Sequence, residues 1–180
     1  MVPLEYFHVV FTVPHQLSEL MLQNKRLLYN LLFRCVAATL LEVAANPKRL
    51  GAEIGFLCVL HTWGQTLIHH PHIHCVVPAG GFAPGRTQWV RPKRAGFFLP
   101  KEVLSEVFRG EIHRRLKSSF PPEETLLPRL AGLAGGAAFV REIRARTLSD
   151  QMGGLRQEAL RRAGACVALP GALYSPGSDL

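Results

Sequence analysis

Near the start of the chain, a segment with the composition of a β-strand is followed by one whose apolar residues recur at helical spacing. The segment YFHVVFTV (6–13) is rich in aromatic and β-branched residues and is followed by Pro14. This pattern predicts a strand. Through residues 15–45 the apolar side chains recur at helical spacing until Asn46-Pro47 stops them. We therefore expect one long helix there.

Two further apolar runs lie close together and predict a hairpin. They are FLCVLHTW (56–63) and IHHPHIHCVVPAGG (68–81), the second ending in a Gly-Gly turn. Strands separated by so short a loop pair antiparallel. A short strand is predicted for residues 87–90, and a second helix for residues 100–120.

The pattern weakens after the Pro121-Pro122 pair. Residues 139–143 are compatible with a continued helix, but from about Arg146 the chain has no convincing period. We expect residues 1–120 to form the core of the protein and residues 121–180 to be irregular.

The triplet His72-Ile73-His74 in the second strand of the predicted hairpin contains candidate metal ligands. On a strand, residues i and i+2 point to the same face. His72 and His74 should therefore project side by side, while Ile73 turns into the core. Two imidazoles held together make half of a divalent-metal site. The hairpin would bring His61, or Gln65 in the loop, near enough to act as a third ligand; the alternative is that the histidines only pack.

The composition indicates a packed core and suggests a class of partner. The hydrophobic fraction of 48% supports a packed interior, and the formal net charge of +8 suggests a polyanionic partner, with nucleic acid first. A basic stretch follows the hairpin and suits a phosphate backbone, although charge runs are commonly just solvated. Its members are Arg86, Arg91, Lys93 and Arg94. Thr12 could direct a hydroxyl at the same ligand, or could simply favour a strand.

The cysteines and the hydropathy point to the cytoplasm. The four cysteines form no C-x-x-C pair and are flanked by apolar residues, as expected of buried thiols in a reducing compartment. We recognise no signal peptide and no uninterrupted apolar run that would span a bilayer. No membrane association is expected.

Four blocks together resemble one family. The segments YFHVVFTVP, LHTWGQTL, HPHIHCVVPAGG and FFLPKEVLSEVFRG resemble the IS91-type rolling-circle transposases, which are HUH endonucleases. The resemblance spans residues 4–117. It implies an α+β fold, with a ferredoxin-like antiparallel sheet and helices on one face. It also implies Mg²⁺ or Mn²⁺ at His72 and His74, single-stranded transposon ends as the partner, and nicking and rejoining of that DNA through a 5′-phosphotyrosine.

Two family features are missing from the sequence. Family members begin with a cysteine-rich zinc-binding segment, and their nucleophilic tyrosines sit in a YxxxY block downstream of the second helix. Here the only tyrosine after the histidine triplet is Tyr174. We therefore assign no catalytic tyrosine and expect this copy to be inactive in strand cleavage.

A frameshift would explain the missing block. With permitted codons, a one-base shift from Met152 to Asp179 can read WVVYAKKPFGGPEHVLRYLGRYTHRVAI, which contains YLGRY and resembles the family's catalytic block. We infer a frameshift between Ser118 and Met152.

Two other functions fit parts of the pattern. His70, His72 and His74 form the H-x-H-x-H of a histidine-triad nucleotide hydrolase, in which His72 would be the nucleophile and no metal would be needed. A remnant that binds DNA without cutting it would share the fold and the basic stretch.

Overall fold

The computed structural model describes residues 5–13, 17–64, 67–119 and 155–160. Gln65, Cys166, Tyr174 and the predicted helical stretch 139–143 lie outside these residues. The strands are β1 (Tyr6–Thr12), β2 (Leu57–Trp63), β3 (His69–Pro78), β4 (Gly81–Phe82), β5 (Trp89–Val90) and β6 (Leu155–Leu160), and the helices are α1 (Ser18–Gln23), α2 (Lys25–Ala45) and α3 (Lys101–Ser119).

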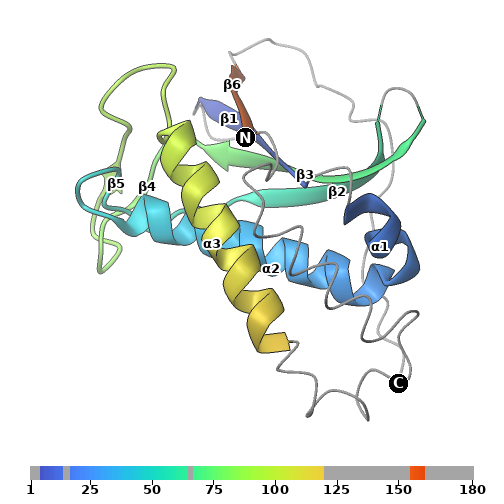
Figure 1. Ribbon diagram of the computed structural model, residues 1–180. Coiled ribbons are helices and arrows are strands. Elements are labelled where there is room, and N and C mark those ends of the chain that lie inside the picture. The colour runs from blue at the N-terminus through green and yellow to red at the C-terminus, as the bar shows by residue number, and fades with distance from the viewer. Residues whose placement is uncertain (1–4, 14–16, 65–66, 120–154, 161–180) are drawn as a thin grey trace, which may run out of the picture.

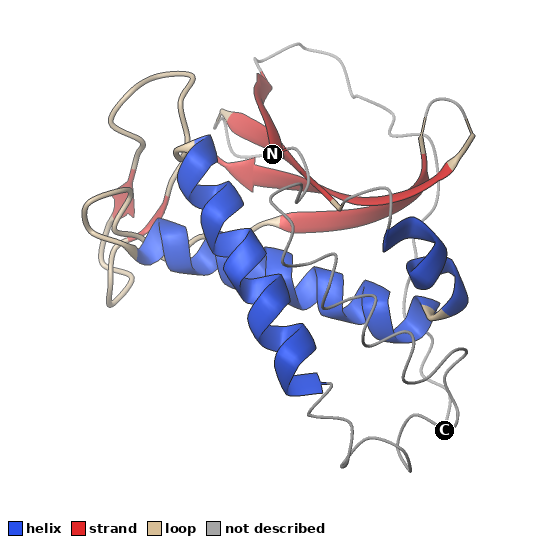
Figure 2. Ribbon diagram, viewed as in Figure 1, coloured by secondary structure: helices blue, strands red, loops and turns tan. Residues whose placement is uncertain are grey.

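A four-stranded antiparallel sheet forms the centre of the molecule, with strand order β2-β3-β1-β6. The helices lie on one face of this sheet (Figures 1 and 2). Apart from the small β4–β5 ribbon, the order β1, α2, β2, β3, α3, β6 is the βαββαβ arrangement of ferredoxin-like folds. The expected α+β class is confirmed, as is the antiparallel pairing of β2 with β3.

Strict alternation along β1 and β3 separates a core face from an open face. Phe7, Val9 and Phe11 of β1 are fully buried, and Ile73 and Val77 of β3 are fully buried beside them. The residues between them are only partly buried. Every second side chain therefore enters the core under the helices, as the sequence predicted for Ile73.

Helices α2 and α3 close the core. The buried residues of α2 recur every three or four positions, and they are Leu28, Leu32, Cys35, Val36, Thr39, Leu40, Val43 and Ala44. From α3, the Phe108 ring packs against Phe11 with 5.0 Å between centroids. Burial of these rings and aliphatic side chains is the main stabilising term for such a fold.

The single helix predicted for residues 15–45 is wrong in one respect, because it is two helices. Asn24 separates α1 from α2, with φ −128° and ψ 46° outside the helical region. Its carbonyl oxygen nevertheless accepts the first hydrogen bond of α2, from Leu28 N–H at 3.0 Å. Apolar spacing alone does not reveal this break, because it continues across Asn24.

Helix α2 is also long and apolar enough to cross a bilayer, but half of that window is buried inside the protein. A core helix meets the same criteria, and the contacts of α2 with the rest of the core account for its composition.

Residues 155–160 correct the expectation of an irregular tail for that segment. They form β6, which pairs antiparallel with β1 from Tyr6↔Leu160 to Phe11↔Leu155. Strand pairing is made by backbone groups, so it requires no apolar periodicity. The rest of the predicted tail lies outside the described residues.

Candidate metal centre

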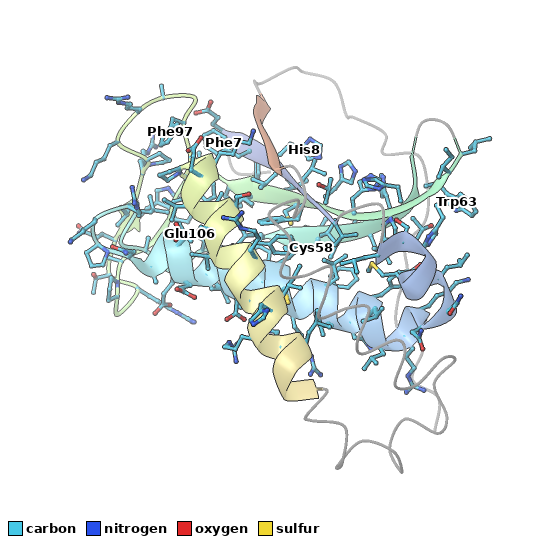
Figure 3. All side chains as sticks on the ribbon, viewed as in Figure 1. Phe7, His8, Cys58, Trp63, Phe97 and Glu106 are labelled. Atoms are coloured by element: carbon cyan, nitrogen blue, oxygen red, sulfur yellow. The ribbon has the colours of Figure 1, made fainter. Side chains whose placement is uncertain are left out.

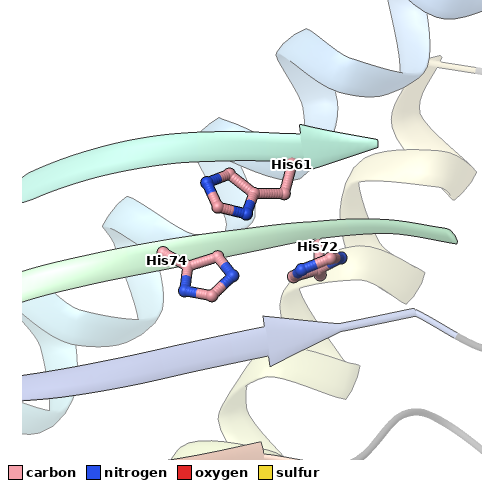
Figure 4. A group of neighbouring side chains, drawn as sticks. All are labelled: His61, His72 and His74. Atoms are coloured by element: carbon pink, nitrogen blue, oxygen red, sulfur yellow. The ribbon is translucent and has the colours of Figure 1, made fainter. Parts of the chain in front are cut away.

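The strand register gathers the predicted ligands on the open face. His61 of β2 lies directly opposite His72 of β3, and His74 follows two residues along the same strand. Residues paired across antiparallel strands point to the same face. The three rings therefore project together from the side of the sheet that carries no described helix (Figure 4).

The three imidazoles are close enough to share one ion. One ligand nitrogen from each of His61, His72 and His74 lies within 4.8 Å of the other two. The ring centroids of His61 and His74 are 4.1 Å apart, and those of His72 and His74 are 4.9 Å apart. Metal–nitrogen bonds are about 2.0–2.1 Å for zinc. Separations of this size can therefore close around a cation after small side-chain movements.

Hydrogen bonds on the other ring nitrogens orient two of the ligands. His72 Nδ1 lies 2.7 Å from the carbonyl oxygen of His70. A carbonyl only accepts, so His72 Nδ1 carries the proton and Nε2 keeps its lone pair for a metal. His74 Nδ1 lies 2.6 Å from His8 Nε2, and His74 Nε2 is buried without a hydrogen-bond partner. A buried nitrogen left in this state fits a metal ligand.

The environment keeps His74 neutral. Burial lowers its pKa to about 4, helped by the neighbouring His61, His72 and His8. The pKa of His61 is also lowered, first by burial and then by His72 and His8. Metal binding requires neutral imidazole. At neutral pH these rings are therefore ready to bind without losing a proton.

The predicted DNA-contacting residues fall in two places. Thr12 lies directly opposite His72 on β1 and so shares its face. The four basic residues are exposed on the lobe that includes β4 and β5, beyond the end of β3 (Figure 1), and they are Arg86, Arg91, Lys93 and Arg94. Arg86 there forms an exposed 3.5 Å ion pair with Glu53. Only Thr12 is thus brought next to the histidines.

Sequence reasoning missed His8 as a neighbour of the cluster. Its ring lies beside that of His74, with centroids 4.8 Å apart and planes at 18°. Figure 3 shows it on the side of the sheet opposite Cys58 and the helices. The alternation of β1 places His8 on the same face as Thr12, and that parity could have revealed it.

Neither described tyrosine lies beside the cluster. The Tyr29 hydroxyl is 3.0 Å from His69 Nε2, and His69 has the strand parity of Ile73, which is buried in the core. Tyr6 is paired with Pro78, four residues along β3 from His74, or about 13 Å at the usual rise.

Comparisons with known proteins identify the family of the chain. The family model described as "Putative transposase" (Y2_Tnp) matches residues 55–147, just over half of the chain. This stretch contains all three histidines of the cluster. No solved structure matches.

Two curated proteins are similar over shorter stretches. "Putative transposase y4qJ" of Sinorhizobium fredii (strain NBRC 101917 / NGR234) is 58% identical over 116 residues, covering 64% of this chain and 29% of that protein. "Transposase for insertion sequence element IS801" of Pseudomonas savastanoi pv. phaseolicola is 45% identical over 74 residues, covering 41% of this chain and 17% of that protein. The chain spans less than a third of the length of either relative. With the family model matching over half of its length, this chain belongs to the Y2 transposase family.

Proposed function

We propose that this chain carries the metal-binding and DNA-binding part of a rolling-circle transposase that nicks and rejoins single-stranded transposon ends. The observation that carries the proposal is the set of three imidazoles from two neighbouring strands, converging on the open face of the sheet. Family membership supplies the class of substrate, which is DNA.

The histidines would hold a divalent cation, Mg²⁺ or Mn²⁺. Three nitrogen ligands would come from His61, His72 and His74. The hydrogen bonds of Nδ1 in His72 and His74 orient these two rings. Imidazole is not a preferred ligand of Mg²⁺, so three nitrogens favour Mn²⁺. Bound there, the cation would polarise the scissile phosphate and stabilise charge on its oxygens.

The rest of the open face would position the DNA. Thr12 lies opposite His72 on the open face, and its hydroxyl would contact a phosphate placed over the cluster. Exposed Arg91, Lys93 and Arg94 offer charge to the backbone farther along the strand. Such contacts fix the register of a nucleic acid without reading its sequence.

We propose that this copy does not cleave. The described tyrosines do not reach the cluster, and Tyr174 is not part of a YxxxY block. The family match ends at residue 147, just before Met152, where the shifted frame begins to read as the catalytic block. This coincidence supports a frameshift. Sequencing the gene tests it: if the +1 frame there lacks YLGRY, the frameshift is excluded.

Membership of the transposase family argues against the histidine-triad hydrolase. A noncatalytic DNA-binding remnant remains compatible with the proposal. We propose a cytoplasmic location for the protein, where DNA would be its partner.

The central experiment measures melting temperature with and without Mn²⁺. A ligand present at 100 times its Kd stabilises the folded state by about 2.7 kcal/mol. We expect wild type to gain stability with Mn²⁺ and His72→Ala to gain none. His113→Ala is the matched control, since His113 is exposed on α3, on the helix side of the sheet. An equal gain in all three proteins would refute the metal centre.

A second experiment separates binding from cleavage. Single-stranded transposon-end DNA should bind in a salt-dependent way. We expect no covalent protein–DNA adduct after incubation with Mn²⁺. A stable adduct would show that this copy is active, and absence of binding would contradict the DNA-binding role.

A further inference from the structure

We propose that His8 is a positioning residue of the metal centre: its Nε2 accepts the proton of His74 Nδ1 and thereby leaves His74 Nε2 free to bind the cation. The inference rests on the proposed metal site. It adds a residue from a third strand, β1, to a cluster built on β2 and β3.

The geometry separates His8 from the ligands. His8 Nε2 is directed at His74 Nδ1, 2.6 Å away, and the two rings lie within 18° of parallel. The set of nitrogens within 4.8 Å of one another comprises His61, His72 and His74 and does not include His8. His8 therefore contacts the back of one ligand and does not face the centre of the site.

The strand register explains this contact. His8 lies opposite Val76 on β3, while Val10 lies opposite His74. His8 and His74 are thus diagonal neighbours on the open face, a spacing that long or aromatic side chains bridge. Because β1 and β3 are paired along seven residues, the backbone fixes where the His8 ring can lie.

The proton arrangement follows from the chemistry of the two partners. One proton lies between His74 Nδ1 and His8 Nε2, and either ring could carry it. If His8 carried it, His74 would hold its own proton on Nε2, a buried atom with no acceptor among the described residues. If His74 carries it on Nδ1, the buried Nε2 has a lone pair facing the other imidazoles. The second arrangement leaves no buried N–H unsatisfied, and it is the form that binds metal.

His72 shows the same device in a simpler form. Its Nδ1 donates to the His70 carbonyl oxygen at 2.7 Å, which fixes Nε2 as the ligand atom. At His74 the partner of Nδ1 is the His8 side chain. Both ligands of the His-x-His triplet are thus oriented through Nδ1, one by backbone and one by a side chain.

Nitrogen-15 NMR of the metal-free wild-type protein at neutral pH tests the proton arrangement directly. We expect His74 in the Nδ1–H form and His8 Nε2 as an unprotonated acceptor. A His74 ring protonated on Nε2 would overturn the proposal, whatever the variants do.

Mn²⁺ titration of variants tests the consequence. His8→Phe keeps a flat ring but has no acceptor, and the affinity for Mn²⁺ should fall about 10- to 100-fold, the usual effect of losing such a partner. His8→Gln offers a carbonyl oxygen and should restore most of the affinity. Equal affinity of His8→Phe and wild type would contradict the inference, as would a loss in His8→Gln as large as that in His8→Phe.

Two comparisons keep this test distinct from that of the metal site. If His72→Ala abolishes Mn²⁺ binding but His8→Phe does not weaken it, only the role of His8 fails. If His72→Ala binds as well as wild type, the metal site itself is wrong. Unfolding in EDTA reports any general loss of stability in each variant, so a folding defect is recognised before affinities are compared.

Discussion

Three other imidazole rings surround His74, and this crowding sets its chemistry. Burial and the charges that His61, His72 and His8 would carry both disfavour its protonated form. Unprotonated nitrogen is the form that a metal binds. The same crowding that makes His74 a poor base in the metal-free protein therefore makes it a ready ligand.

The stability of the metal-free protein should fall as the pH drops below the ordinary pKa of histidine. The folded pKa of His74 is about 4, against 6.5 in the unfolded chain. Above 6.5 both states are neutral, but between 6.5 and about 4 only the unfolded state gains the proton. The shift corresponds to at most about 3 kcal/mol, less for a partly exposed ring. Urea unfolding in EDTA across this range measures it.

The control variants for this pH effect are His74→Gln and His113→Gln. His74→Gln should lose less stability on acidification than wild type. Part of the effect should remain, because the pKa of His61 is also lowered. His113→Gln should behave like wild type. A stability that does not change over the same range would contradict the buried, neutral state of His74.

Individual site residues could be predicted from sequence to the extent that they shared a strand or a hairpin. His72 and His74 follow from strand parity alone, and His61 follows once the hairpin is assumed. His8 is 66 positions from its partner His74. Local spacing carries no information about such a contact, which depends on β1 pairing with β3.

Because side chains alternate along the strands, the candidate site residues lie on one face of the sheet and the core residues on the other. Val76 and Val77 are adjacent residues of β3, yet Val77 is fully buried under the helices and Val76 lies on the open face. The same substitution at the two positions should therefore have different costs.

We expect Val77→Ala to lower the free energy of unfolding by roughly 2–3 kcal/mol, the combined effect of lost burial and a residual cavity. Val76→Ala should cost well under half of this. Chemical denaturation of both variants in EDTA gives the comparison. Similar losses at the two positions would show that the sheet does not have one covered and one open face.

The turn into the β4–β5 ribbon requires a glycine. Gly80 has φ +133°, and a Cβ there would collide with the Val90 carbonyl oxygen and lie 2.6 Å from Trp89 Nε1. L-residues rarely adopt this backbone conformation. The close approach of the turn to β5 holds the ribbon against the end of β3.

Gly80→Ala should destabilise the protein by more than about 1 kcal/mol, because the strain cannot be relieved by moving a flexible side chain. Gly55→Ala is the matched control, since a Cβ at that position meets nothing within 4 Å. Thermal unfolding of the two variants checks the difference. Equal melting temperatures would contradict the described turn.

Prediction from sequence succeeded for the elements with a clear apolar pattern, and residues 87–90 were correctly expected to contain a short strand, β5. The strands β1, β2 and β3 and the helix α3 lie within a few residues of their predicted bounds. The strand β4 was missed because its two residues begin within the predicted Gly-Gly turn, and the tail strand β6 was missed because it is defined by its backbone pairing with β1. The break at Asn24 was also missed, since apolar spacing continues through it.

The described part of the molecule presents a histidine-bearing face on one side of the sheet and a basic lobe beyond the end of β3. Arg91, Lys93 and Arg94 are exposed on that lobe, while the helices occupy the opposite face of the sheet. A DNA strand held by both regions would run along β3 from His74 toward Pro78.

Neutralising the lobe should reduce the salt dependence of single-stranded DNA binding. Each phosphate contact that is lost lowers the slope of log K against log salt by about 0.7. The triple variant Arg91→Ala, Lys93→Ala, Arg94→Ala should therefore bind less tightly and with a shallower slope. Arg109→Ala, an exposed position on α3, serves as the charge control. An unchanged slope in the triple variant would remove the lobe from the DNA-binding surface.

The irregularity between His61 and Trp63 divides the hairpin into parts that tolerate insertion differently. A β-bulge takes up an additional residue locally. Beyond it, the tip can lengthen or shorten in related chains without disturbing the cluster. Between Cys58 and His61, which pair in continuous register with β3, one inserted residue would rotate His61 to the helix side. The histidine cluster, and with it the proposed metal site, would then be broken up with every histidine still present in the sequence.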